Sequence, residues 1–95
     1  MTSPFDAAGA LEAVDRIVNR GGDPDDVIAA VLRALERRGV PYAAVEPGPE
    51  VGTARDAIVR PVVRGGAEVA VLRVAVDEEA FVERVAALIS PYVSR

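Results

Sequence analysis

The chain has 95 residues, of which 51% are hydrophobic and 27% charged, and this balance predicts a single folded domain, residues 1–95, rather than a disordered segment. Its net charge of −4 argues against a nucleic acid as partner, and the absence of cysteine and histidine removes disulfides, thiolate metal sites, the commonest general base and Ser-His-Asp chemistry. From these missing residues we expect a protein that is not an enzyme and needs no metal or cofactor. We also expect it to be cytoplasmic, because no apolar run reaches the ~18 residues of a membrane span and the N-terminus lacks the basic start of a signal peptide.

Two helices are predicted in the first 40 residues. Ser3 as a cap, followed by proline, predicts that the first helix begins near Pro4, and a Gly-Gly pair ends it. Asp23 then begins a second helix that runs to about Arg38. Apolar residues at steps of three and four give each helix one buried face. These residues are Ala7, Leu11, Val14, Ile17 and Val18 in the first helix and Val27, Ile28, Val31, Leu32 and Leu35 in the second.

Strands and a last helix are predicted in the rest of the chain. The run VPYAAV, which starts at Val40, indicates a short strand between two prolines. Residues 46–56 contain two prolines and two glycines and are predicted to form a loop. Residues 57–64 and 67–76 form a hairpin about a Gly-Gly pair, and a final helix opens at Asp77 and ends near Pro91. These elements predict an α+β fold, with a small antiparallel sheet and helices packed on one face.

The hairpin contains three arginines among valines. With Gly65 and Gly66 as the loop, positions whose numbers sum to 131 face each other. One face is then almost wholly apolar and should carry the helices; it consists of Ala57, Val59, Pro61, Val63, Ala70, Leu72 and Val74. The other face holds Arg60, Arg64 and Arg73 beside Ile58, Val62, Val69 and Val71.

Two interpretations of the arginine face stay open. In the first, the arginine stems cover valines while their guanidinium groups reach water. In the second, the face is a shallow surface for a small acidic ligand, and the candidate binding residues are Arg60, Arg73 and Tyr42. Arg60 and Arg73 should be neighbours that repel each other slightly. A bound anion, Glu46 or Glu50 from the loop, or a carboxylate of a partner chain would relieve that repulsion.

The helices carry more apolar surface than one small sheet can cover. We therefore predict a homodimer, with Leu11, Ile17 and Leu88 as candidate interface residues, although apolar stripes are first of all packing positions. The acidic run DPDD at the start of the second helix complements the helix dipole and is not interpreted as a metal site.

Three strings resemble a known family. The segments AIVRPVVRGGAEVAVLRVAV, from Ala57, and DEEAFVERVAALISPYV, from Asp77, resemble the C-terminal half of GAF domains, where a proline-bearing strand, a glycine hairpin, a strand with a Gly-Val-Leu-like run and a closing helix follow one another. Alanine at position 70 replaces the first residue of that run. The segment DPDDVIAAVLRALERRGVPYAAV, from Asp23, is similar to the family's opening helix and first strand.

This resemblance implies a GAF/profilin-like fold with the order α-α-β-β-β-α and a truncated sensory or regulatory domain of signal transduction, non-enzymatic and dimeric. The chain departs from the family at residues 47–56, where further strands and a helix normally wall a ligand pocket. The family's cyclic-nucleotide signature and its bilin and haem ligands are also missing, so none of those ligands is carried over. The alternative is a ligand-free scaffold whose hairpin face binds another protein.

Overall fold

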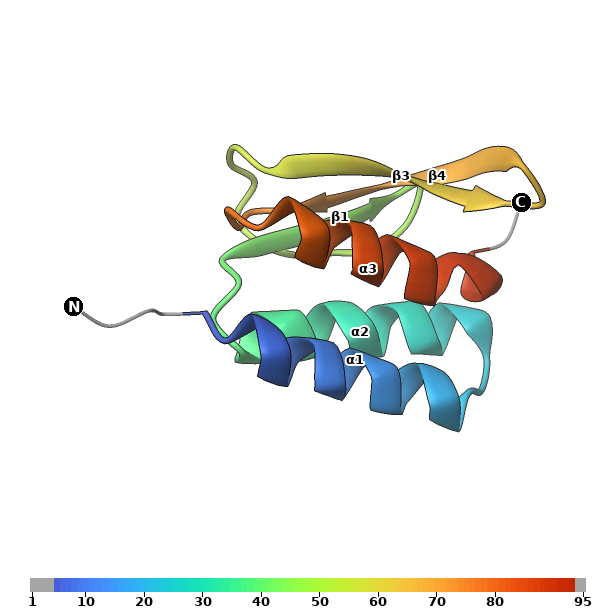
Figure 1. The fold of residues 1–95 in the computed structure, drawn as a ribbon, viewed down its shortest axis with the longest axis horizontal. Helices are drawn as coiled ribbons and strands as arrows, with labels where there is room; N and C mark the ends of the chain where they lie inside the picture. The colour runs from blue at the N-terminus through green and yellow to red at the C-terminus, as the bar shows by residue number, and fades with distance from the viewer. Residues whose placement is uncertain (1–4, 94–95) are drawn as a thin grey trace.

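The computed structural model describes residues 5–93, and these form three α-helices on one side of a four-stranded antiparallel sheet (Figure 1). The elements are α1 (Ala7–Arg20), α2 (Pro24–Arg37), β1 (Tyr42–Glu46), β2 (Glu50–Gly52), β3 (Ile58–Arg64), β4 (Ala67–Val74), α3 (Glu79–Ile89) and the short 3₁₀ helix η1 (Ser90–Tyr92). The strands lie in the order β2-β1-β4-β3. The predicted α+β class is confirmed, with four strands where three were expected.

The first two helices follow from local sequence signals. The side chain of Asp6 accepts a hydrogen bond of 3.1 Å from the backbone N–H of Gly9, so Asp6 caps α1 and the helix begins at Ala7. The start is therefore later than predicted, and the expected cap and first residue, Ser3 and Pro4, lie outside the described residues. The helix ends at Gly21, whose φ of 72° favours glycine. The second helix has its predicted bounds.

The segment predicted as a loop contains a strand. Residues 50–52 pair antiparallel with β1, in the register Tyr42↔Gly52 and Ala44↔Glu50. The prolines lie in the turn before β2, so they do not interrupt its ladder. Gly52 has a φ of 82°, and a Cβ on it would clash with the backbone carbonyl of Pro41. The prediction failed because proline and glycine were interpreted as strand breakers, although here they stand at the strand's two ends.

The hairpin has the predicted Gly-Gly turn but not the predicted register. The pairs Arg64↔Ala67 and Val63↔Glu68 follow the expected rule, after which the register shifts by one residue and leaves Val69 without a partner. Such a β-bulge exchanges the faces of one strand relative to the other. The remainder of β3 therefore pairs as Arg60↔Leu72 and Val62↔Ala70, which places these four residues on the helix side. The predicted faces of β3 are therefore wrong, because Val59 and Val63, which were expected to face the helices, are exposed, and Val62 is buried instead.

The core fills the space between the sheet and the helices. The second helix packs on β1 and β2, the third packs on β3 and β4, and α1 packs against both of these helices (Figure 1). The largest fully buried side chains are Val14, Val31, Leu32, Leu35, Val40, Val62, Leu72, Val74, Val82, Val85 and Ile89. Most of the residues predicted for the helices' inner faces are among the buried residues. Within residues 5–93, no helix combines the length and apolar character that crossing a membrane would require.

Candidate functional site

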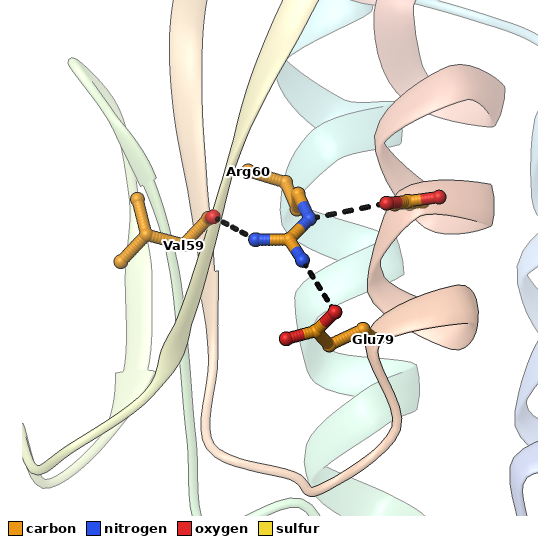
Figure 2. Close-up of polar contacts among 4 residues, drawn as sticks. Val59, Arg60 and Glu79 are labelled. Atoms are coloured by element: carbon orange, nitrogen blue, oxygen red, sulfur yellow. Dashed lines mark hydrogen bonds and ion pairs between the residues drawn. The ribbon is translucent and has the colours of Figure 1, made fainter.

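Arg60 joins the edge strand β3 to the helix α3. Its Nη2 lies 2.9 Å from Oε1 of Glu79 and its Nε lies 3.3 Å from Oε2 of Glu83, while Nη1 donates a 2.8 Å hydrogen bond to the carbonyl of Val59 (Figure 2). The side chain is 27% exposed. All three nitrogens of this guanidinium group therefore have partners within the chain, and the residue holds the helix against the sheet edge.

Arg73 lies on the opposite face of the sheet. It is paired with Val59 across the hairpin, and its Nε contacts Oε1 of Glu46 at 3.0 Å. Pairing with Glu46 was one of the three arrangements expected for the arginines, and the structure shows it for Arg73. The prediction that Arg60 and Arg73 share one face is wrong, because the bulge turns Arg60 toward the helices. No anion can lie between their two guanidinium groups.

Tyr42 does not complete a ligand surface with these arginines. It lies two residues from Ala44, the partner of Arg73, and so belongs to the same face as Arg73. Its side chain is nevertheless buried, with 4% exposed. The structure thus separates the three candidate ligand residues, since Arg60 and Arg73 are on opposite faces and are both paired with glutamates, and Tyr42 is covered.

The free edge of β3 is poorly suited to binding another strand. The carbonyl of Val59 is taken by Arg60, and the carbonyl of Val63 accepts a 2.7 Å hydrogen bond from Oγ of Ser90. Pro61, between them, has no N–H to offer. A partner peptide adding to a sheet edge needs a row of free backbone groups, and this edge lacks several of them.

The candidate dimer residues lie on two surfaces. Leu11 and Leu88 line one shallow groove of about 370 Å³ between α1 and α3, together with Glu12, Asp15 and Arg84. Ile17 lines a different groove, between α1 and α2. All three side chains are only partly buried.

The groove between α1 and α2 is lined by five arginines. Its volume is about 350 Å³. Its apolar lining consists of Ala13 and Ile17 from α1 and Ala30 and Ala34 from α2. The charged lining consists of Arg16, Arg20, Arg33, Arg37 and Arg38. We call this surface, defined by these nine residues, the arginine groove.

The charge of the arginine groove is only partly compensated, since Glu12 lies beside Arg16 and the carboxylate of Asp6 lies near Nη1 of Arg38, next to Gly9. It holds five of the chain's 11 basic residues and no acidic one, although the whole chain has a net charge of −4. Among residues 5–93, Arg16 is the one lining arginine with an ion-pair partner, Glu12 at 3.9 Å, and both side chains are largely exposed. Arg60 and Arg73, in contrast, are neutralised by closer glutamates.

Helix stability explains only part of this clustering. Arg20 and Arg37 stand in the last turns of their helices, where a positive charge interacts favourably with the helix dipole. Arg33 has no such position. The spacing of four residues between Arg16 and Arg20, and between Arg33 and Arg37, is unfavourable, because like charges at that spacing weaken a helix by about 0.2–0.5 kcal/mol per pair. Arg38 is the C-cap of α2 and benefits from the dipole in the same way, and Arg16 pairs with Glu12, so Arg33 is the lining arginine that these helix effects leave unexplained.

Sequence reasoning missed the arginine groove because it treated each helix alone. The strings RIVNR, residues 16–20, and RALERR, residues 33–38, both contain arginines four residues apart, and this spacing was the signal in the sequence. The groove exists because residues 21–23 fold α2 back beside α1.

The acidic side chains do not form a comparable site. In the part of the chain that the structure describes, no group of three or more acidic residues is placed to hold a metal ion. A depression of about 420 Å³ lies between β3 and α3, but its charged lining residues, Arg60 and Glu83, pair with each other. The arginine groove is consequently the strongest candidate for a functional surface.

No family model, curated protein or solved structure matches this chain. The resemblance to GAF domains stays a prediction, and the function is argued from the geometry.

Proposed function

We propose that this chain is a non-enzymatic binding module whose arginine groove takes a negatively charged surface of a partner. The observation that supports this proposal is the cluster of five arginines around an apolar lining, four of them without an ion pair in residues 5–93. The proposal keeps the regulatory or interaction role expected from the sequence and moves its site from the hairpin to the helices.

Arginine chemistry favours binding over catalysis at this site. A guanidinium group stays protonated in proteins, so it neither removes a proton from a substrate nor acts as a nucleophile. It does bind carboxylates and phosphates through two parallel hydrogen bonds. The other lining residues are alanines and one isoleucine, which supply apolar contact and no reactive group.

Several weak contacts must act together in such a complex. An exposed ion pair contributes about 0.2–1 kcal/mol, so binding strength depends on the number of arginines engaged and on apolar contact with the alanines. Interactions of this kind are screened by salt. We expect weak binding whose affinity falls as the ionic strength rises.

A matched pair of double variants tests the proposal. Poly-L-glutamate, heparin and a single-stranded DNA oligonucleotide, each labelled with a fluorophore, are titrated with the protein at 50 and 300 mM NaCl, and binding is followed by fluorescence anisotropy. Arg33→Gln/Arg37→Gln removes two groove charges, and Arg55→Gln/Arg73→Gln removes two charges outside the groove. We expect only the first variant to lose affinity. Absence of binding to all three probes at 50 mM, or equal losses in both variants, would refute the proposal.

The homodimer is a separate proposal, which rests on the surface between α1 and α3. Leu11 and Leu88 stand side by side there, partly exposed, and this arrangement suits an apolar contact between two copies. The arginine groove lies on another side of α1 and would stay accessible in such a dimer.

A further inference from the structure

We infer that the occupant of the arginine groove is an acidic amphipathic helix of a partner protein, an inference that rests on the proposed function. Three features of the groove support it. They are the absence of backbone groups to pair with, the small size of the apolar lining residues and the arrangement of the arginines in two rows.

The groove offers a partner no backbone hydrogen bonds. Its two sides are the helices α1 and α2, whose interior N–H and C=O groups are bonded within each helix. An extended peptide in the groove would have backbone N–H and C=O groups that form hydrogen bonds only with water or with nothing. Burying such groups without a hydrogen-bond partner costs free energy. A helix satisfies its backbone internally, so it covers the groove without that cost.

The lining lets a third helix approach closely. Three of its four apolar residues are alanines. Helices pack at axis separations of about 8–10 Å, with the shorter distances reached where side chains at the contact are small. The α2 side of the groove extends from Ala30 to Arg38, which at 1.5 Å per residue corresponds to about 12 Å, or roughly two helical turns.

The arginines form a row on each side of this apolar strip. Arg16 and Arg20 belong to α1, and Arg33 and Arg37 belong to α2, each pair separated by four residues or about 6 Å along the helix. Both pairs stand in the C-terminal half of their helix, and α1 and α2 run antiparallel, so the pairs lie toward opposite ends of the groove (Figure 1). An occupant helix that carries two acidic residues four apart on each side of its apolar stripe, with one pair toward each end, matches this arrangement. This is how charges flank the apolar seam between helices in coiled coils.

A nucleic acid fits the same surface less well. Single strands bind strongly where bases stack on aromatic side chains, and no aromatic residue lines the groove. The net charge of −4 also opposes the approach of a long polyanion. A second copy of this chain is a poorer match as well, because Glu79 and Glu83, which are four residues apart on α3, are held by Arg60.

Three peptides of identical composition and a DNA oligonucleotide test the inference. The first peptide is an 18-residue helix that has a stripe of leucine and alanine flanked by glutamates and ends in a proline. The second has the same residues in scrambled order. In the third, the terminal proline and the central residue of the first peptide change places. The oligonucleotide carries the same net charge. Binding is measured by anisotropy at 100 mM NaCl, and peptide helicity by circular dichroism with and without protein.

We expect the amphipathic peptide to bind at least about tenfold more tightly than the scrambled and proline peptides and to gain helicity on binding. The variant Arg33→Gln/Arg37→Gln should weaken this binding by about tenfold, as expected for two lost ion pairs, and Arg55→Gln/Arg73→Gln by less than about twofold. The variant Ala30→Leu fills the apolar strip without a change in charge and should weaken binding of the amphipathic peptide but not that of DNA. Circular dichroism of each variant alone checks that its fold is retained.

The outcomes separate this inference from the proposed function. Equal affinity for the amphipathic and scrambled peptides, or tighter binding of DNA through the same arginines, would overturn the acidic helix as occupant while leaving an anion-binding groove. If none of the probes binds in a manner that depends on Arg33 and Arg37, both the inference and the proposed function fail.

Discussion

The exchange Arg60→Met tests whether this arginine holds α3 against the edge of the sheet. Methionine keeps much of the apolar stem and removes the guanidinium group. The variant loses the contacts with Glu79 at 2.9 Å and Glu83 at 3.3 Å, together with the 2.8 Å hydrogen bond to the carbonyl of Val59. The β3 strand and α3 should then separate more easily.

The expected loss follows from the exposure of these groups. The two glutamates are 69% and 62% exposed, so each ion pair belongs to the weak class of about 0.2–1 kcal/mol. The hydrogen bond to the backbone adds about 1 kcal/mol. The free energy of unfolding should therefore fall by about 1.5 kcal/mol, which for a domain of this size lowers Tm by about 6–12 °C.

Arg73→Met is the matched control, because Arg73 is another strand arginine paired with a glutamate. It has one ion pair, at 3.0 Å, and is itself 39% exposed, so its loss should cost about 0.5 kcal/mol or less. Urea unfolding at 50 and 500 mM NaCl measures both variants, and high salt should reduce the difference between them. Equal destabilisation by the two exchanges would refute the assignment of Arg60 as the residue that joins sheet and helix.

Two further predictions concern a glycine and the dimer. In thermal unfolding, Gly52→Ala should destabilise the protein by about 1–3 kcal/mol more than Gly66→Ala. Both glycines have a φ near 80°, but of the two Gly52 alone faces a backbone carbonyl, that of Pro41. Equal effects would show that the contact between residue 52 and this carbonyl is unimportant. In sedimentation at micromolar concentration, the wild-type protein should be a dimer and the Leu88→Glu variant a monomer. The Ile17→Gln variant, which changes the arginine groove, should stay dimeric. A monomeric wild-type protein would refute the homodimer proposal.

The helices could be predicted from the sequence because their signals are local. Apolar residues recurring every three or four positions identified the buried side of α2 and the side of α1 that packs on the core, and the Gly-Gly pair after Arg20 marked a true helix end. The start of α1 was misplaced because serine followed by proline predicted a cap at Ser3, whereas Asp6 caps the helix in the structure.

The face of Arg60 could not be predicted because the bulge leaves little trace in the polarity pattern. A shift by one residue buries Val62 in place of Val63 and leaves Val59 exposed, and both arrangements look equally apolar from the sequence. Only contacts with α3 distinguish them, since the actual register brings Arg60 within reach of Glu79 and Glu83. The ion pairs and the register therefore support each other, but neither is a local property of the hairpin.

The arginine groove shows that net charge and local charge favour different partners. A charge of −4 for the whole chain acts on a distant polyanion, yet at 0.1 M salt electrostatic interactions decay over about 10 Å. That length is comparable with the roughly 12 Å extent of the groove, so a ligand in contact with Arg33 and Arg37 is affected mainly by the five lining arginines and much less by acids elsewhere on the surface. The average charge thus disfavours long, uniformly charged partners such as nucleic acids, while the local charge favours a short acidic segment that fits within the groove.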